Sequence, residues 1–192
     1  MMHIITGSAR GVRLETLPGE ATRPTAERTK EAVFSMLQFD LEGRRVLDLF
    51  AGSGQLGLEA LSRGASLAVM VDRAREACAV IRKNAEKTKL ISRTKILSLD
   101  ANAYLASCKD GPFHLVFLDP PYAAGLLPSV LRTLLARELL APGATVVVEC
   151  GDPQDLFGGD VELPTRYEII KNKRYGAAHV FFLSPAQRKE EL

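Results

Sequence analysis

"DLFAGSGQLGLEAL" (residues 48–61) places three glycines between an apolar run and an amphipathic one. The run that leads into it, "RVLDL" (45–49), is typical of a buried strand, and "QLGLEALSRG" (55–64) is typical of a helix. Gly52, Gly54 and Gly57 therefore form G-x-G-x-x-G at a strand-to-helix turn. Glycines permit a tight turn and a close ligand, and the start of a helix offers backbone N–H groups. The stretch predicts a ligand site at the carboxyl end of a parallel strand.

The same alternation continues on the C-terminal side of this loop. Further strands are predicted at "LAVMVD" (67–72), "TKILSL" (94–99), "FHLVFLD" (113–119) and "TVVVEC" (145–150). Helical patterns separate them at "RAREACAVIRKNAEKTK" (73–89), "ANAYLASC" (101–108) and "LLPSVLRTLLARELL" (126–140), with Gly64 and Gly143 as helix stops. Repeated strand and helix predict an α/β fold with a mostly parallel, doubly wound sheet of Rossmann-like type.

Both ends of the chain depart from this repeat. Residues 1–20 are predicted to form a hairpin around Gly-Ser-Ala-Arg-Gly, followed by an amphipathic helix over 25–39 that Pro24 opens. At the other end "RYEIIKN" (166–172) and "AHVFFLS" (178–184) predict an antiparallel hairpin, which brings the sheet to seven strands. We expect one domain, 1–192, with an N-terminal hairpin-and-helix extension (1–44), a Rossmann-like core (45–184) and a tail (185–192).

The composition narrows the class of protein. The chain has 192 residues, 46% of them hydrophobic, which suits one domain with a full core. A net charge of +2 does not by itself indicate a nucleic-acid partner. The three cysteines form no zinc or disulfide pattern, and neither a leader nor a run of membrane-spanning length occurs. These features favour a cytoplasmic protein with no metal and no membrane contact.

The glycine loop is compatible with two cofactors. Asp72 ends the next strand, 20 residues after Gly52, where a carboxylate binds ribose hydroxyls in both NAD and S-adenosylmethionine sites. Asp48, just ahead of the loop, favours S-adenosylmethionine, because that cofactor has an ammonium group for a carboxylate and carries no phosphate. Asp100, at the end of the third strand, is interpreted as a contact to the adenine amine, as a helix N-cap, or as both.

A second cluster of polar groups ends the fourth strand at "DPPY" (119–122). Pro120 and Pro121 have no backbone N–H, so with Asp119 the segment presents only hydrogen-bond acceptors. The matching ligand is an –NH2 group, such as the exocyclic amine of a base, and Tyr122 offers a face on which that base can stack. The alternative interpretation is a Pro-Pro turn with a surface tyrosine.

The order of these motifs is similar to that of amino-methylating class I methyltransferases that use S-adenosylmethionine. More narrowly, "IITGSARGVRL", "TRPTAERTKEAVFSML", "DLFAGSGQLGLEALSRGA", "DPPY" and "KRYG" resemble the RsmD family of bacterial 16S rRNA guanine-N2 methyltransferases. The resemblance runs from residue 3 to about residue 184. It implies methyl transfer to N2 of one guanine in 16S rRNA, within an assembled or assembling 30S subunit, by a monomer.

The resemblance also implies which residues form each part of the site. Catalytic positions are Asp119, Pro120, Pro121 and Tyr122; cofactor positions are Asp48, Phe50, Gly52, Ser53, Gly54, Asp72, Asp100 and Ala101; RNA-binding positions are Arg10, Arg23 and Arg28. Lys173 and Arg174, which cluster in the last predicted hairpin, are further candidates for RNA contacts by their charge. The basic positions are equally well interpreted as a solvated face. The chain departs from the family pattern at Gln55, Asp72, Glu27 and Ser35. Asp72 stands where Glu is usual and is one methylene shorter, which bears on its ribose contact.

Three other functions remain open from the sequence. A DNA adenine-N6 methyltransferase would use the same acceptor cluster, although such enzymes usually have a large target-recognition domain. A non-catalytic nucleotide- or RNA-binding module leaves Asp119 and Tyr122 unexplained. An NAD-dependent oxidoreductase would need room for a substrate domain.

Overall fold

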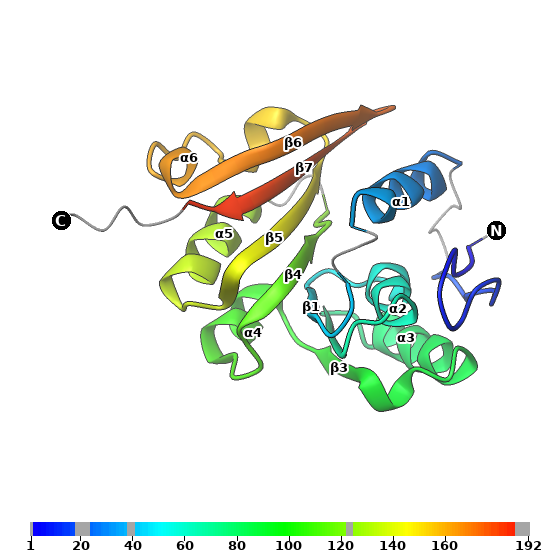
Figure 1. Cartoon of the computed structure of the whole chain (residues 1–192). Helices are drawn as coiled ribbons and strands as arrows, with labels where there is room; N and C mark the ends of the chain where they lie inside the picture. The colour runs from blue at the N-terminus through cyan, green and yellow to red at the C-terminus, as the bar shows by residue number, and fades with distance from the viewer. Residues whose placement is uncertain (1, 18–23, 38–40, 122–124, 187–192) are drawn as a thin grey trace.

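The computed structural model describes residues 2–17, 24–37, 41–121 and 125–186, with the backbone alone for 24–28. Its centre is a seven-stranded sheet in the order β3-β2-β1-β4-β5-β7-β6 (Figure 1). The strands are β1 (Arg45–Asp48), β2 (Leu67–Asp72), β3 (Thr94–Ser98), β4 (Phe113–Leu118), β5 (Leu140–Cys150), β6 (Tyr167–Tyr175) and β7 (Ala178–Pro185). The first five are parallel to one another, and β7 is antiparallel to both β5 and β6. The predicted seven-stranded Rossmann-like sheet with a C-terminal antiparallel hairpin is confirmed.

Helices cover both faces of the sheet. They are α1 (Pro24–Leu37), α2 (Gln55–Ser62), α3 (Arg75–Lys87), α4 (Ala101–Ser107), α5 (Leu127–Ala136) and the short α6 (Leu163–Arg166), with 3-10 turns at Ile91–Arg93 and Pro153–Leu156. One buried cluster joins α1, α2 and α3 to side chains such as Phe117 and Val147. A second joins α4 and α5 to the opposite face through residues such as Phe113 and Val116. Burial on both faces explains why the parallel strands are continuously apolar.

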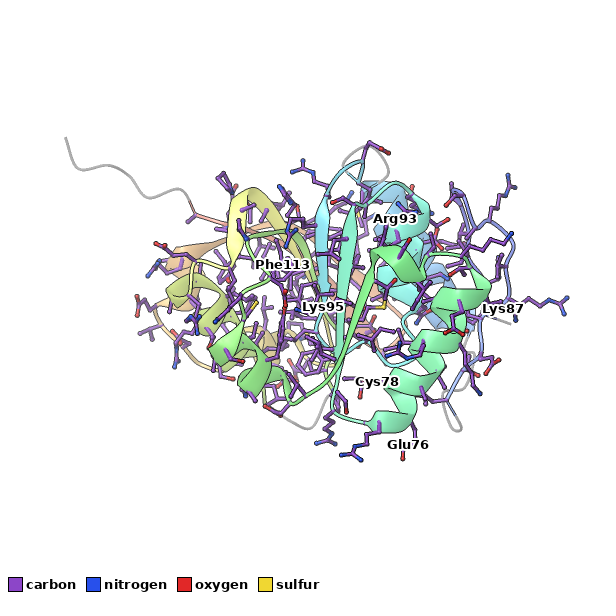
Figure 2. The ribbon with its side chains drawn as sticks, turned by 90° about the horizontal axis from the view of Figure 1, so that it is seen from below. Glu76, Cys78, Lys87, Arg93, Lys95 and Phe113 are labelled. Carbon is purple, nitrogen blue, oxygen red and sulfur yellow. The ribbon has the colours of Figure 1, made fainter. Side chains whose placement is uncertain are left out.

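Helix α3 has one buried side and one side that faces solvent. Its buried side is formed by Ala77, Ile81, Asn84 and Ala85, and its remaining positions are mostly polar. Figure 2 shows Glu76 and Lys87 at opposite ends of this helix. An acidic side chain in the first turn and a basic one in the last match the helix dipole. No helix within the described ranges combines the length and the apolar character needed to cross a bilayer.

The N-terminal hairpin (residues 2–17) reverses direction as predicted, and its arms pair through Ile4 N–H to the Val12 carbonyl and Leu14 N–H to the Met2 carbonyl, both at 3.0 Å. One antiparallel bridge joins His3 to Arg13, and Gly11 N–H donates to the Ile4 carbonyl at 2.8 Å. The N–H groups of Ile5 and Thr6 instead donate to the carboxylate of Glu59 in α2, at 2.7 and 3.1 Å. The hairpin thus pairs over a short stretch as predicted, and the N–H groups that point away from its partner arm hold it against α2.

The region from 126 to 150 differs from the prediction in two ways. Helix α5 ends at Ala136 rather than near residue 140, because Glu138 takes a left-handed conformation (φ 51°) and ends the helix. Strand β5 begins at Leu140, and Gly143 (φ 69°) lies within it and not at a helix stop. Gly64 does follow the end of α2, with its N–H donating to the Leu61 carbonyl, so that helix stop is confirmed.

Candidate cofactor and substrate site

A cavity of about 700 Å3, the large cavity, opens at the carboxyl ends of the central parallel strands. Strands β1 and β4 are neighbours in the sheet, and the strand order reverses between them. Open α/β sheets bind their ligands at the carboxyl ends of the strands at such a reversal. Eight residues named from the sequence line it: Phe50, Gly52, Asp72, Asp100, Ala101, Asp119, Pro120 and Pro121. The chain thus brings the predicted cofactor residues and the predicted base-binding segment into one space.

Asp72 is fixed in this wall by two backbone groups. Its Oδ2 accepts from Gly52 N–H at 2.9 Å, and its Oδ1 accepts from Ala74 N–H at 2.9 Å. Each carboxylate oxygen has more than one lone pair, so both can still accept from a hydroxyl group. The carboxylate therefore holds the glycine loop against β2 and remains suited to binding a ribose.

Asp100 is the N-cap of α4. Its Oδ1 accepts from the N–H groups of Asn102 and Ala103 at 2.9 and 3.1 Å, which confirms the capping interpretation. Both bonds use the same oxygen, and the residue is exposed and lines the large cavity. The predicted contact to an adenine amine remains compatible with this geometry.

Asp48 and Ser53 lie behind the cavity wall. Asp48 is 2% exposed, and its Oδ2 accepts from Gly57 N–H at 3.1 Å, which satisfies one of the N–H groups at the start of α2. Burial raises the pKa of Asp48 to about 7; the Gly57 bond opposes this shift, and the nearby Asp72 carboxylate adds to it. Ser53 is also buried, with its hydroxyl 3.3 Å from the Met2 sulfur. The side chains of these two residues therefore stabilise the glycine loop from its buried side.

Gly54 is constrained by its backbone conformation and also by neighbours in the core. It is left-handed (φ 78°), as its glycine suggests, and a Cβ there would lie 3.1 Å from Ile81 Cγ2 and from the Met70 sulfur. A side chain at this position would therefore be crowded by α3 and β2, which approach the backbone from the core side.

The base-binding segment lies at the end of β4. Asp119 is exposed, Pro120 is buried, and both line the large cavity together with Pro121. Tyr122 falls outside the described residues. Asp119 also lines a second, small cavity of about 70 Å3, which extends beneath α1.

The charge of the large cavity separates the two cofactors that the glycine loop left open. Three carboxylates, those of Asp72, Asp100 and Asp119, belong to its described lining, with one guanidinium, that of Arg73. A predominantly acidic wall suits a ligand with a sulfonium and an ammonium group and opposes the two phosphates of a dinucleotide. The residues present therefore fit S-adenosylmethionine.

The predicted RNA-binding residues are spread over two surfaces. Arg10 is exposed on the N-terminal hairpin, and Lys173 and Arg174 are exposed on β6. The tip of the β6–β7 hairpin reaches α1, where Tyr175 packs against the cluster that α1 covers (Figure 1). Arg23 and the side chain of Arg28 fall outside what the structure describes.

Two buried polar residues that were not identified from the sequence hold the N-terminal hairpin near the site. The Asn84 side chain accepts from Glu15 N–H (2.8 Å) and donates to the carbonyls of Glu15 (3.0 Å) and Ser53 (2.9 Å). Glu59, fully buried, accepts from the hairpin and from Arg63 Nε at 2.8 Å. A polar residue within an apolar helix face was the available signal in both cases. The missed lining residues are Leu17, Leu49, Arg73, Leu99 and Leu126, mostly neighbours of predicted positions.

The fold, the glycine loop and the acid-lined cavity together define a Rossmann-like methyltransferase. The Escherichia coli protein yhhF, described as a candidate methyltransferase, superposes with a TM-score of 0.82 at 29% identity, over 96% of this chain and 97% of that one. Residues 2–184 match the model of the family described as "Conserved hypothetical protein 95", and the chain belongs to that family.

Two relatives of this chain are named as ribosomal RNA methyltransferases. "Ribosomal RNA small subunit methyltransferase D" of Escherichia coli is 33% identical over 175 residues, which cover 91% of this chain and 85% of the relative. A Bacillus subtilis protein, YlbH, described as a candidate rRNA methyltransferase, is 37% identical over 165 residues, 85% of this chain and 86% of the relative. The predicted resemblance to the RsmD family and the predicted cofactor, S-adenosylmethionine, are confirmed.

Proposed function

We propose that the protein methylates the exocyclic N2 amine of a guanine in 16S rRNA, with S-adenosylmethionine as the methyl donor. The observation that carries the proposal is the position of Asp119, Pro120 and Pro121 in the same cavity as Gly52 and Asp72. A cluster of acceptors beside a cofactor wall suits an amine that must meet a methyl group. The names of the family relatives indicate that the substrate is ribosomal RNA of the small subunit.

In this proposal, some residues of the large cavity bind the cofactor and others bind the target base. Asp72 and Asp100 would hold the ribose and the adenine amine, and Asp48 supports the glycine loop through Gly57. Bound S-adenosylmethionine supplies an electrophilic methyl group that the amine takes up directly, without covalent attachment to the protein.

Asp119 and the carbonyl-only backbone at Pro120 and Pro121 would orient the amine. Hydrogen bonds to its two N–H groups direct the nitrogen lone pair away from the protein acceptors and toward the methyl group. Orientation of this kind can be worth about 7–11 kcal/mol in well-aligned systems. Asp119 would also accept the proton that the nitrogen loses after it gains the methyl group, and no strong base is needed because the nitrogen is then positively charged and very acidic.

The N-terminal extension and β6 would contribute the RNA contacts. Arg10, Lys173 and Arg174 are exposed on the surfaces that flank α1, and α1 in turn covers the small cavity beside Asp119. We propose that a monomer acts in the cytoplasm on an assembled or assembling 30S particle, with residues 1–192 as one domain.

The test is a map of rRNA methylation by mass spectrometry in a strain that lacks the protein. The expected result is one guanine of 16S rRNA that lacks its N2 methyl group, restored by the parent gene and not by the Asp119→Ala variant. Purified protein is then offered 30S particles, free 16S rRNA and DNA with labelled cofactor. Methyl transfer to adenine in DNA, with no change in the rRNA map, would overturn the proposal in favour of a DNA methyltransferase.

A further inference from the structure

The small cavity beneath α1 shares Asp119 with the large cavity. Its volume of about 70 Å3 has room for several water molecules, and so for the polar edge of a ring rather than for a whole base. Its lining comes from α1, from the start of α2 and from the ends of three strands: Thr29, Lys30, Val33, Gln55, Leu56, Phe117, Leu118, Asp119, Val147, Glu149 and Val180. A base held by Asp119 would therefore present one edge to this space.

Glu149 stands beside Asp119 in the sheet. Strands β4 and β5 are parallel, and Leu118 is paired with Val148, so the next residue of each strand, Asp119 and Glu149, lies at the same level. Side chains alternate along a strand, and Phe117 and Val147 both point into the cluster under α1. Two residues further on, both carboxylates are thus on the α1 side of the sheet, and both line the small cavity.

The opposite wall of the small cavity carries positive charge. Lys30 of α1 is 3% exposed, and its Nζ donates to the His3 carbonyl at 2.7 Å and lies 3.9 Å from Glu59 Oε2. The charge of this ammonium is therefore compensated by Glu59. The strand side of the cavity carries the carboxylates of Asp119 and Glu149.

We propose that Glu149 accepts a hydrogen bond from N1–H of the target guanine and so makes the site specific for guanine over adenine. This assignment rests on the proposed function. The Watson–Crick edge of guanine presents the N2 amine and N1–H as neighbouring donors and then O6 as an acceptor. The two adjacent carboxylates of Asp119 and Glu149 match the two neighbouring donors of that edge.

Adenine does not match the same walls. Its N1 is an acceptor, so with its amine on Asp119 it would turn a lone pair toward a carboxylate. A site that is built to accept a hydrogen bond rejects a ligand that lacks the donor, because the ligand's lone pair then faces the lone pairs of the carboxylate. Glu149 would therefore select the base, while Asp119 serves the reacting amine.

The experiment uses 30S particles reconstituted with 16S rRNA that carries guanine or 2-aminopurine at the mapped position. 2-Aminopurine keeps the N2 amine but has neither N1–H nor O6. Single-turnover methylation of both particles is measured with the parent protein, Glu149→Gln and Glu149→Leu. Glu168→Gln, an exposed acid on the edge strand β6, is the matched control.

We expect the parent to prefer guanine by about 100-fold or more, as sites with a required donor do. The preference should fall at least tenfold in Glu149→Leu and should stay unchanged in Glu168→Gln. Glu149→Gln keeps an acceptor oxygen and gains an amide donor for N1 of 2-aminopurine, so its preference should fall through a faster reaction of the analogue. The preference is a ratio within one preparation, so partial misfolding of a variant does not alter it.

A preference that is the same in the parent and in Glu149→Leu would overturn this assignment and would leave Glu149 a structural residue. That result differs from failure of the proposed function, in which the parent would form no N2-methylguanine in any particle.

Discussion

The Gly52 N–H and the Asp72 carboxylate are 2.9 Å apart, donor to acceptor, although 20 residues separate them in the chain. The bond ties the glycine loop after β1 to the end of β2, and a second bond, from Ala74 N–H, holds the other carboxylate oxygen. The group that would bind the ribose is thus positioned before any ligand arrives.

Replacing Asp72 by Ala should weaken S-adenosylmethionine binding at least tenfold, about 1.4 kcal/mol. The change removes the acceptor for the ribose and frees the loop at Gly52. Calorimetric titration measures the affinity. Asp152→Ala is the control, because Asp152 also accepts from a backbone N–H (Gln154, 2.9 Å) but does not belong to the described cavity lining. Equal affinity in both variants would remove Asp72 from the cofactor site.

Replacing Gly54 by Ala should destabilise the protein more than replacing Gly143 by Ala. Both glycines are left-handed, which costs an L-residue about 1–2 kcal/mol. A Cβ at Gly54 also crowds Ile81 and Met70, whereas a Cβ at Gly143 would have nothing within 4 Å. Urea unfolding of both variants without cofactor gives the two losses. Equal losses would show that backbone conformation is the whole reason for Gly54.

Asp48 should make stability depend on pH. Its pKa in the folded chain, about 7, lies above the ordinary value of 3.8, so between those pH values the folded state holds a proton that the unfolded state has released. The free energy of unfolding therefore falls as pH rises through this window, and the contribution of Asp48 becomes constant above pH 7.

Asp48→Asn removes this titration. Between pH 5 and pH 8 the variant should lose about 2–3 kcal/mol less than the parent, by the usual conversion of a pKa difference. Urea unfolding at pH 5, 6, 7 and 8 gives both profiles. His114, whose pKa burial lowers, titrates in both proteins and cancels in the difference. Parallel profiles would contradict a protonated Asp48 in the folded state.

Changes at Asp119 should separate chemistry from cofactor binding. Asp119→Asn keeps one oxygen but adds a competing NH2 group, so methyl transfer should slow and remain measurable. Asp119→Ala removes the acceptor and should slow single-turnover transfer to unmodified 30S particles by about 100-fold or more. Cofactor affinity should stay near that of the parent. Transfer by Asp119→Ala at the parent rate would mean that the end of β4 is only a turn.

The basic residues should contribute to RNA affinity in a salt-dependent way. Arg10→Ala and Lys173→Ala should each reduce the slope of log affinity against log salt by about one unit, without changing cofactor affinity. Arg166→Ala in α6, on the layer opposite α1, is the control and should leave the slope unchanged. Slopes that do not move in the first two variants would indicate that these side chains are only a solvated face.

Strongly patterned segments could be predicted closely from the sequence. "LAVMVD" gives β2 with both boundaries correct, because a β-branched apolar run that ends on a charged residue leaves few alternatives. The cavity lining at Gly52, Asp72, Asp100 and Asp119 followed from the rule that parallel strands converge at their carboxyl ends.

The features that were mispredicted depend on contacts between distant residues. The apolar pattern continues past Ala136, and nothing local marks Glu138 as the left-handed residue that ends α5. The core-side crowding at Gly54 comes from Met70 and Ile81, on two other elements. The contact of the N-terminal hairpin with α2, in which the buried Glu59 carboxylate accepts from Ile5 and Thr6, was missed because it joins residues more than 50 positions apart.

That last contact has a consequence for how the chain folds as it is made. The N-terminal hairpin leaves the ribosome before its partners Glu59, Ser62 and Asn84, which are synthesised more than 50 residues later. Until then the amides of Ile5, Ala9 and Glu15 lack their native partners, since contacts between distant residues form late. The hairpin therefore cannot be held in its native position before α2 and α3 have been synthesised, and a nascent chain that stops before Glu59 cannot hold it there.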